Sequence, residues 1–240
     1  MSKIPKIIHQ IWLGPNIRPD IWMNSWKIDY CKQYPDWEYK LWTEKEINEF
    51  GLKNKAQYEF EKFYNGKSDI ARYEILNKYG GLFIDADSLW IKESINCLDD
   101  IILESNTYGF FCAKEPKNSH IYANGVIGSI PNHKILNDMI DHIQSNYFEL
   151  KKTSNLERQI WQITGTQPFS NIVNNNYNKL KNVLILEHFF FYPVSFHQNN
   201  LNLDTKSFHI KYPKAIMFQY GYTTNNILHN NCMKKYIEKK

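Results

Sequence analysis

Two acidic residues, Asp85 and Asp87, are the side chains of this sequence most suited to chemistry. They come directly after the apolar run LFI and are separated by one alanine. In an extended chain residues i and i+2 point to the same side, so we expect both carboxylates to face one point. Carboxylates this close repel each other unless one is protonated or a cation lies between them. The pair therefore predicts a site for Mn²⁺ or Mg²⁺, which prefer oxygen ligands and bridge phosphates. The alternative interpretation is an exposed turn that carries two acids.

A second charged pair, Asp69 and Arg72, stands slightly earlier in the chain. Residues three apart lie on one face of a helix, where a carboxylate and a guanidinium can act together. The carboxylate would accept hydrogen bonds from sugar hydroxyls, and the guanidinium would bind a phosphate. The alternative is a surface ion pair, which would contribute little to stability.

The elements around these residues are expected to position them. Ser68 is a good helix N-cap, and residues 70–79 are compatible with a helix throughout. Gly80 and Gly81 then end the helix, because glycine adopts the left-handed conformation at little cost. The order is helix, Gly-Gly stop, buried strand and two acids, which places the acids at the carboxyl end of a strand.

The remaining pattern alternates strands with helices and predicts an α/β fold with a mostly parallel central sheet flanked by helices. In such sheets ligands bind outside the carboxyl ends of the strands. Thr43 with Glu46 forms a capping box that begins a short helix, Asn132 is expected to cap another, and a loop is expected over 164–168. Strands are predicted over 6–12, 37–42, 82–84, 108–113, 123–130, 183–186 and 215–218, and further helices over 20–34, 57–64, 132–147 and 156–163.

Bulk properties narrow the classes of protein. A chain of 240 residues with a formal net charge of +4 fits a single domain over 1–240 and argues against nucleic-acid binding, because its basic residues are scattered among acids. No segment is apolar for long enough to cross a membrane, which predicts a cytoplasmic protein, with a peripheral membrane contact of the basic C-terminal end left open. The four cysteines, expected to be reduced and without a metal role, are Cys31, Cys97, Cys112 and Cys232.

Four stretches of the sequence together resemble glycosyltransferase family 32, whose members carry a DXD sugar-binding region. They also resemble the catalytic domain of the large clostridial glucosylating toxins and the yeast-type α-mannosyltransferases. The matching stretches run from the N-terminus to about residue 170 in the order of the family, and the third is long and specific. They read IPKIIHQIWLG, WEYKLW, SDIARYEILNKYGGLFIDAD and TGTQPF.

The resemblance implies a GT-A type fold and a retaining, metal-dependent transfer of a hexosyl unit from a nucleotide sugar. A UDP-sugar is favoured as the donor and GDP-mannose is the alternative, while the acceptor is a glycan, a lipid-linked sugar or a protein. The leaving diphosphate itself would accept the proton of the acceptor. Position by position, the resemblance implies Trp12 for the nucleobase, Ser68, Asp69 and Arg72 for the sugar and diphosphate, Asp85 for sugar or ribose hydroxyls, Asp87 for the metal, and Asn124, Thr164 and Gly165 near the sugar.

The chain departs from the family pattern near its C-terminal end. Related enzymes carry a histidine near a Ser-Trp pair there, which helps to bind metal and phosphate, whereas this chain reads AIMFQYGYTT. If nothing replaces the histidine, metal affinity would be weak and the protein slow or inactive. Candidate replacements are Gln219, Tyr220 and Tyr222, or His209 and His229 from nearby.

Two other functions remain as alternatives. A degenerate transferase would bind the nucleotide sugar without turnover, an interpretation motivated by the missing histidine. A phosphohydrolase of the haloacid dehalogenase type also places DxD after an apolar strand, but usually near the N-terminus and with Thr or Val where this chain has Leu89. The helix that carries Asp69 has no role in that fold.

Overall fold

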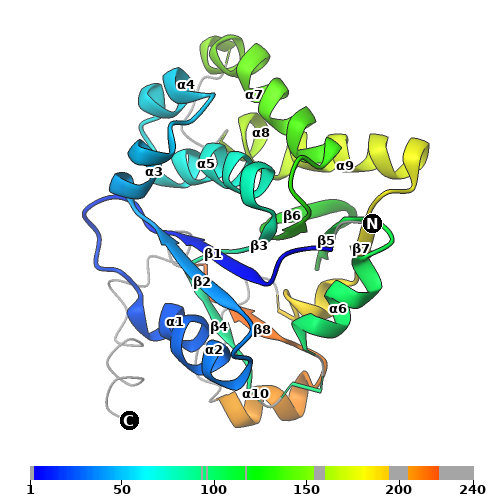
Figure 1. The fold of residues 1–240 in the computed structure, drawn as a ribbon. Coiled ribbons are helices and arrows are strands. Elements are labelled where there is room, and N and C mark those ends of the chain that lie inside the picture. The colour runs from blue at the N-terminus through cyan, green and yellow to red at the C-terminus, as the bar shows by residue number, and fades with distance from the viewer. Residues whose placement is uncertain are drawn as a thin grey trace.

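A six-stranded sheet forms the centre of the molecule, in a computed structural model that describes residues 3–92, 94–95, 97–116, 118–153, 160–194 and 205–221 (Figure 1). The strand order is β2-β1-β3-β6-β5-β7, in which β1 pairs parallel with β2 and β3, and β5 pairs parallel with β7. β6 runs antiparallel to both of its neighbours, so the sheet is mixed but mostly parallel, as predicted. The strands are β1 (Ile7–Ile11), β2 (Glu38–Trp42), β3 (Gly81–Ile84), β5 (Phe110–Glu115), β6 (Asn118–Ser129) and β7 (Leu184–Leu186).

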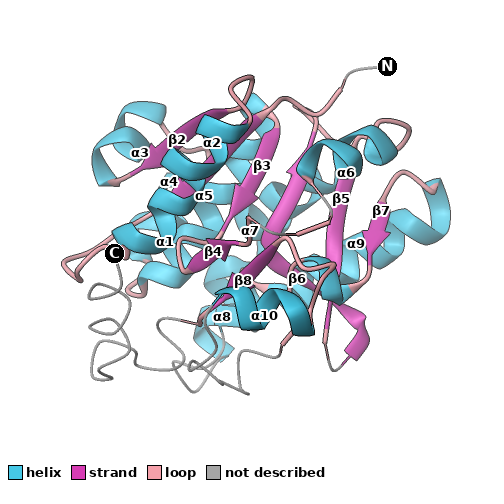
Figure 2. Ribbon diagram, turned by 90° about the horizontal axis from the view of Figure 1, so that it is seen from below, coloured by secondary structure: helices cyan, strands magenta, loops and turns pink. Residues whose placement is uncertain are grey.

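Helices cover both faces of the sheet. The helices α3, α4, α5, α7, α8 and α9 lie on one face, while α1, α2, α6 and α10 lie on the other (Figures 1 and 2). Their bounds are α1 (Asp20–Asn24), a π-helix (Ser25–Tyr30), α2 (Cys31–Gln33), α3 (Glu44–Phe50), α4 (Lys55–Phe60), α5 (Tyr64–Tyr79), α6 (Leu98–Ser105), α7 (Lys134–Thr153), α8 (Ile160–Ile163), α9 (Thr166–Leu180), a 3₁₀ helix (His188–Phe190) and α10 (Thr205–Lys211).

The alternation of side chains along β3 explains this layering. Phe83 points into one hydrophobic core, under α5 and α7, while Leu82 and Ile84 point into a second core on the opposite face. Successive residues of a strand face opposite sides of the sheet, so a strand that is buried on both faces must be apolar throughout. The four residues of β3 are all buried. β3 is therefore held on both sides, and the acids that follow it start from a fixed point.

The Gly-Gly stop between α5 and β3 is present and is sterically required. Gly80 and Gly81 have φ of 65° and 95°, in the region that favours glycine. A Cβ on Gly81 would lie 2.6 Å from the carbonyl oxygen of Ile7, and one on Gly80 would lie 2.9 Å from that of Ser129. The chain can thus reverse from α5 into β3 only with glycine at both positions.

A second sheet, of two strands, lies next to the turn that carries Asp85 and Asp87. β4 (Ser88–Trp90) pairs antiparallel with β8 (Met217–Gln219), with Ser88 opposite Gln219. In Figure 2 this pair lies in front of the central sheet, beside α10. The acidic turn between β3 and β4 is therefore adjacent to the last described strand.

Several predicted element bounds are wrong. α5 begins at Tyr64, so Ser68 lies inside the helix and is not its N-cap. The expected helix over 57–64 ends at Phe60, because the chain turns extended at Glu61. α9 begins at Thr166, inside the segment that was expected to be a loop. The helix tolerates Pro168 because the N–H groups of its first turn have no partner within the helix.

Other elements were missed or capped differently. β4 and α6, both of which are short, were not predicted from the sequence. α7 is capped by His133, whose Nδ1 accepts the N–H of Ile135, while Asn132 before it has a left-handed φ of 56°. The N-terminal part of the helix expected over 156–163 lies outside the described residues, as does one of the four cysteines; Cys31, Cys97 and Cys112 are free thiols.

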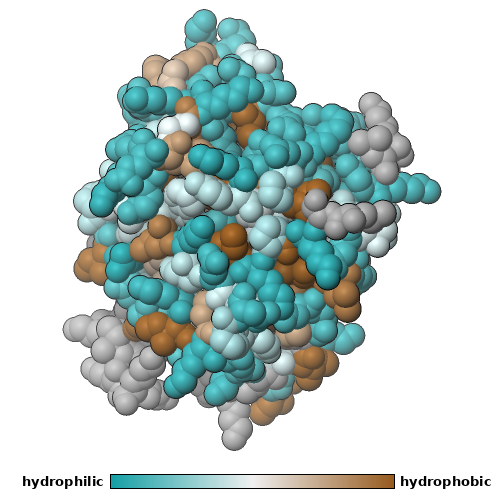
Figure 3. All heavy atoms as spheres, in the orientation of Figure 1, coloured by the Kyte–Doolittle hydropathy of each residue, from teal (hydrophilic) through white to brown (hydrophobic). Residues whose placement is uncertain are grey.

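The part of the chain that the structure describes contains no helix with the length and apolar character that a bilayer span requires. The face shown in Figure 3 is mostly hydrophilic, with small hydrophobic patches scattered over it.

The Thr43 capping box at α3 is formed as predicted, with both reciprocal hydrogen bonds present.

Candidate active site

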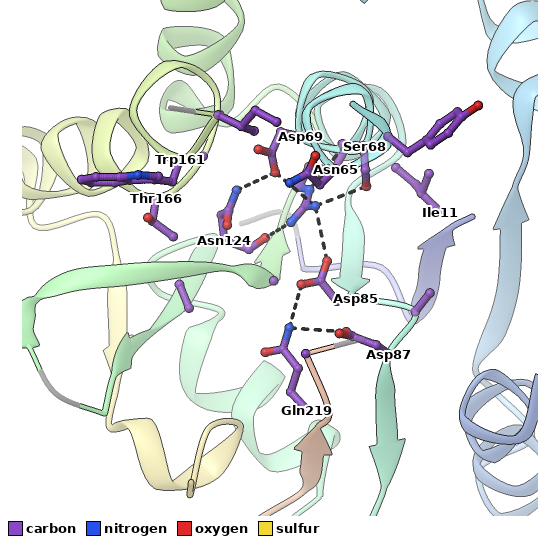
Figure 4. Close-up of a pocket in the computed structure, with 18 of the residues that line it drawn as sticks. Ile11, Asn65, Ser68, Asp69, Asp85, Asp87, Asn124, Trp161, Thr166 and Gln219 are labelled. Carbon is purple, nitrogen blue, oxygen red and sulfur yellow. Dashed lines mark hydrogen bonds and ion pairs between the residues drawn. The ribbon is translucent and has the colours of Figure 1, made fainter. Parts of the chain in front are cut away.

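Asp85 and Asp87 lie in a tight turn between β3 and β4. The N–H and the hydroxyl of Ser88 both donate to the carbonyl oxygen of Asp85, at 3.2 and 2.6 Å. The expected extended conformation of the acid pair is therefore wrong. The two carboxylates nevertheless converge on one group: the Nε2 of Gln219 donates to Asp85 at 3.0 Å and to Asp87 at 3.4 Å (Figure 4).

Arg72 connects this acidic turn to α5. Its Nη2 lies 3.1 Å from Asp69 and 3.3 Å from Asp85, and its Nη1 donates to the carbonyl oxygen of Asn124 (Figure 4). The guanidinium stacks on Phe83, 4.3 Å from the ring centre, and its Nη2 also donates to the Ser68 hydroxyl. A planar guanidinium can hold all these groups together, which a single ammonium cannot.

Asp69 is held by two hydrogen bonds besides its ion pair with Arg72. Asn124 on β6 donates to its Oδ1 at 2.9 Å, and the hydroxyl of Thr164 donates to its Oδ2 at 3.0 Å. Burial raises the pKa of Asp69 to about 6, although Arg72 and these donors oppose the shift. Burial thus outweighs the ion pair here, since a charge removed from water loses its hydration before it gains a partner.

The carboxylates around the turn outnumber the positively charged groups, which favours the binding of a cation. One guanidinium, that of Arg72, lies between Asp69 and Asp85, and Asp87 adds a third carboxylate. Burial raises the pKa of Asp85, and Arg72 and Gln219 oppose this shift. Among the described residues no three histidine, cysteine or acidic side chains gather into a metal site. The donors present fit a hard ion only in part: two carboxylates, and the amide oxygen of Gln219 once its amide group is turned.

Gly125 on β6 leaves room for Asp85. A Cβ at Gly125 would lie 2.4 Å from Asp85 Oδ2 and 3.1 Å from the hydroxyl of Tyr192. That hydroxyl is buried, and it has no hydrogen-bond partner among the described residues. The pKa of Tyr192 is raised well above its ordinary value by burial, so the hydroxyl keeps its proton at neutral pH and can donate a hydrogen bond to a ligand.

A cavity of about 1020 Å³, which we call the central cavity, opens above these groups. Trp12, at the end of β1, lines it together with Ser68, Gly165 and the charged residues described above. In Figure 4 Ile11 and Trp161 lie on opposite sides of the cavity, with Asp85 between them. The cavity therefore has two walls, one formed from the end of β1 and one from α8.

Most of the residues predicted for the site are thus brought together. Thr164 differs from the rest: it is fully buried and does not line the cavity, and its contact is with Asp69 from behind. The ring of Tyr220 stacks on that of Trp22, with 4.2 Å between the ring centroids. This contact argues against Tyr220 as the replacement for the missing histidine. His209 lies on α10 and does not line the cavity, whereas the two remaining candidates are outside the described residues.

Several lining residues were not singled out from the sequence, among them three that carry polar or aromatic groups that could contact a ligand. Glu115 is the last residue of β5, whose first four residues are apolar, and a signal similar to that of Asp85 could have found it. Trp161 stands three residues before the first residue of the TGTQPF stretch, a large aromatic close to a recognised loop. Tyr192 carries no comparable signal, because nothing in its local sequence distinguishes it from the other tyrosines.

Comparison with known proteins agrees with this geometry. Residues 19–108 match the family described as the glycosyltransferase sugar-binding region containing a DXD motif. This stretch carries Asp69, Arg72, Asp85 and Asp87, so the chain contains the sugar-binding region that is typical of this family of DXD glycosyltransferases.

Two curated relatives have the same residue as this chain at about a third of the aligned positions. Inositol phosphoceramide mannosyltransferase 1 of Schizosaccharomyces pombe is 34% identical over 151 residues, which cover 60% of this chain and 44% of the yeast protein. An uncharacterized glycosyltransferase of Acanthamoeba polyphaga mimivirus is 33% identical over 178 residues, which cover 69% of this chain and 63% of the viral protein. The match thus spans about half the length of these relatives.

Solved structures show the same fold at low sequence identity. The PaToxG glycosyltransferase superposes with a TM-score of 0.56 at 21% identity, over 75% of this chain and 71% of that one. The catalytic domain of alpha-toxin from Clostridium novyi gives a TM-score of 0.55 at 12% identity, over 99% of this chain and 82% of that one. The predicted GT-A type α/β fold is confirmed.

Proposed function

We propose that this chain transfers a hexosyl unit from a nucleotide sugar to an acceptor, with a divalent cation bound at Asp85 and Asp87. The observation that carries the proposal is the arrangement of Asp69, Arg72 and the acid pair as one connected group on the floor of the central cavity. A DXD pair on an isolated exposed turn would not be joined to a buried guanidinium.

Each group has a role that its surroundings support. Trp12 offers an aromatic face to the nucleobase at the end of β1. Asp69, fixed by its hydrogen bonds, and Asn124 bind hydroxyls of the donor sugar. Arg72 supplies positive charge next to the diphosphate, although its direct partners in the structure are carboxylates.

Asp87 and Asp85 would hold Mn²⁺ or Mg²⁺, which neutralises the negative charge that develops on the leaving diphosphate. The Gln219 amide stands where it can supply a third oxygen ligand. In this proposal the anomeric configuration is retained and the diphosphate accepts the proton of the acceptor hydroxyl. None of the described side chains is needed as a covalent nucleophile.

The donor and acceptor belong to the proposal as well. A UDP-sugar is favoured because the region around Trp12 and Ser68 resembles enzymes that use UDP. GDP-mannose is the alternative, and it gains weight from the relative named as an inositol phosphoceramide mannosyltransferase. A glycan or a glycolipid headgroup is the acceptor class proposed for this chain.

The second candidate is a protein that binds the nucleotide sugar without turnover. Its supporting observation is Gln219, a neutral side chain at the acid pair where related enzymes have a histidine. Both candidates require donor binding, so turnover alone separates them.

The test is release of nucleotide from UDP-glucose, UDP-galactose, UDP-N-acetylglucosamine and GDP-mannose, each incubated with the protein and Mn²⁺ in the absence of acceptor. Slow hydrolysis of one donor is expected, with loss of at least about 100-fold in the Asp87→Asn variant. Asp141→Asn is the matched control, because Asp141 is an exposed carboxylate paired with Lys53 on the surface.

Three other outcomes would contradict all or part of this proposal. Donor binding by calorimetry without hydrolysis would favour the binding-only candidate, unless adding acceptor restores turnover. Failure to bind any of the four donors would overturn both candidates. Equal loss in Asp87→Asn and Asp141→Asn would remove the acid pair from the mechanism.

A further inference from the structure

Trp161 is a large aromatic side chain at the edge of the central cavity. It is 45% exposed, yet it lines the cavity from the short helix α8. A Cβ on Gly165 would lie 2.7 Å from the Cα of Trp161, so the turn between α8 and α9 is packed as tightly as glycine allows. The backbone that carries the indole is therefore fixed, although the ring itself is open to solvent.

Glu115 lines the same cavity from the end of β5. Within the described ranges its carboxylate has no hydrogen bond or ion pair, unlike the exposed Glu187 nearby, which binds Lys114. Burial raises the pKa of Glu115, and no charged group contributes to the shift. A half-buried carboxylate without a partner retains its full capacity to accept hydrogen bonds from a ligand.

In the strand order β5 lies beyond β3 and β6 from β1, so Glu115 at the end of β5 lines the cavity on the side away from β1, as Trp161 does. Figure 4 shows Trp161 on one side of Asp69 and Asp85 and Ile11, the neighbour of Trp12, on the other. If the nucleobase stacks on Trp12 and the diphosphate lies over the acid pair, the donor uses the β1 side and the floor. The wall at α8 is left for a second molecule.

The size of the cavity agrees with two ligands. Its volume of about 1020 Å³ lies at the upper end of the roughly 300–1,000 Å³ that is usual for one drug-sized ligand. Ile121 and Pro116 add apolar surface beside Glu115. The α8 wall thus combines an open aromatic face, apolar neighbours and one unpaired hydrogen-bond acceptor.

We propose that this wall, formed by Trp161, Glu115, Ile121 and Pro116, is the acceptor subsite, and that the acceptor presents a neutral sugar or cyclic polyol ring to it. The C–H face of the ring packs on the indole, as amphipathic rings do on aromatic side chains, and a ring hydroxyl donates to Glu115. The inference rests on the proposed function, since an acceptor subsite requires a transferase. It goes further by assigning the acceptor's chemical class and the residues that bind it.

The experiment uses the full chain with Mn²⁺ and four ring probes: methyl α-D-mannopyranoside, methyl α-D-glucopyranoside, methyl α-D-galactopyranoside and myo-inositol. Binding of each probe is measured by saturation-transfer NMR, without donor. Transfer to each probe is measured with the donor that the protein hydrolyses. The variants are Trp161→Ala and Glu115→Gln, and the matched controls are Tyr177→Ala, an exposed aromatic outside the cavity, and Glu187→Gln.

We expect at least one probe to bind the unmodified protein and both variants to weaken it, Trp161→Ala by roughly tenfold. In both variants transfer to the probe should fall by a larger factor than hydrolysis of the donor without acceptor, because both residues contact the acceptor in this proposal. The two controls should leave probe binding unchanged.

Absence of binding by all four probes would overturn the acceptor class, even where the donor is hydrolysed normally. An equal decrease of donor hydrolysis and transfer in Trp161→Ala would place the indole on the donor side. If the unmodified protein shows neither donor hydrolysis nor transfer, the proposed transferase function fails. The NMR arm, which needs no donor, still decides whether the wall binds a ring.

Discussion

The side-chain amide of Gln219 lies 3.0 Å from the Oδ2 of Asp85, although 134 residues separate the two positions. The pairing of β8 with β4 brings them together, with Gln219 opposite Ser88 in register. One amide NH₂ group thus donates to two carboxylates that would otherwise repel each other. Asp85 and Asp87 would hold a cation, and Gln219 would join them as a ligand only if its amide turned to offer its oxygen.

Replacing Gln219 by histidine should strengthen metal binding. Mn²⁺ generally favours oxygen ligands, but the group of Gln219 that faces the acids is an amide N–H donor, which cannot bind a cation. A neutral imidazole offers a nitrogen lone pair there, and no amide group has to turn away from the carboxylates. We expect the dissociation constant for Mn²⁺ to fall by about tenfold in Gln219→His. The measurement is titration of Mn²⁺ without nucleotide, followed by electron paramagnetic resonance.

The companion variant Gln219→Ala removes the amide without adding a ligand, and metal affinity should decrease by a few-fold. If the histidine and alanine variants bind Mn²⁺ equally, Gln219 does not face the metal. Unfolding curves in urea check that neither change has disturbed the pairing of β4 with β8.

Gly125→Ala should impair donor binding while the protein remains folded. The new methyl group would lie 2.4 Å from Asp85 Oδ2, so the carboxylate would have to move away from Arg72 and Gln219. Gly125 does not have a positive φ, and alanine therefore causes no backbone strain at this position. Calorimetric titration with the nucleotide sugar should show affinity lowered by about tenfold or more.

Gly51→Ala provides the opposite control. Gly51 ends α3 with a φ of 73°, and a Cβ there would meet no atom within 4 Å. This variant should lose about 1 kcal/mol of stability through backbone strain and keep its donor affinity. A Gly125→Ala protein with normal donor affinity would show that Asp85 has freedom to move.

The sequence was sufficient to predict the half of the site that is local. Asp69 and Arg72 share a helix, and the Gly-Gly stop leads that helix directly into β3 and the acid pair. Both glycines are required by close backbone contacts, so the turn could be read from the residue types alone. The layered α/β fold followed in the same way from the buried strands.

The other half depends on contacts between distant segments. Gln219 reaches the acids only through the pairing of β4 with β8, and β4 has three residues, too few for a periodic pattern. Ser68 was misread as a cap because tertiary packing extends α5 by one turn: a Cβ on Gly66 would lie 2.8 Å from the side chain of Glu61. Its hydroxyl binds Arg72 instead. Local propensity cannot reveal such contacts.

Arg72→Lys should weaken both stability and donor binding. Arg72 is 4% exposed and binds two carboxylates, a hydroxyl and a carbonyl oxygen at once, which one ammonium cannot reproduce. A buried carboxylate left without its partner is expected to cost about 3 kcal/mol of unfolding free energy. Urea unfolding measures this loss, and calorimetry measures the loss of nucleotide-sugar affinity.

The matched control for this charge-conserving change is Arg18→Lys. Arg18 binds Asp20 at an exposed position, so its replacement should change the unfolding free energy by less than about 1 kcal/mol. Equal effects of the two variants would mean that the guanidinium geometry at Arg72 is not required.

Stability should fall as the pH decreases from about 6.5 to about 4, and His9 should cause part of this loss. His9 is fully buried; its Nδ1 accepts the indole N–H of Trp42, so its Nε2 carries the proton and donates to Gly80. Burial lowers the pKa of His9 from 6.5 to about 4. Below pH 6.5 the unfolded chain therefore binds a proton that the native protein excludes, which favours unfolding.

The His9→Gln variant tests this linkage, since a glutamine amide can still donate to Gly80 but does not titrate. The pKa of the buried His133 is also lowered to about 4, so the unmodified protein should lose stability through both residues. Urea unfolding at pH 7.5 and pH 4.5 should show a decrease that is smaller by about 2 to 3 kcal/mol in the variant. A decrease of the same size in both proteins would mean that the imidazole of His9 takes up its proton without unfolding, which the hydrogen bond from Trp42 opposes.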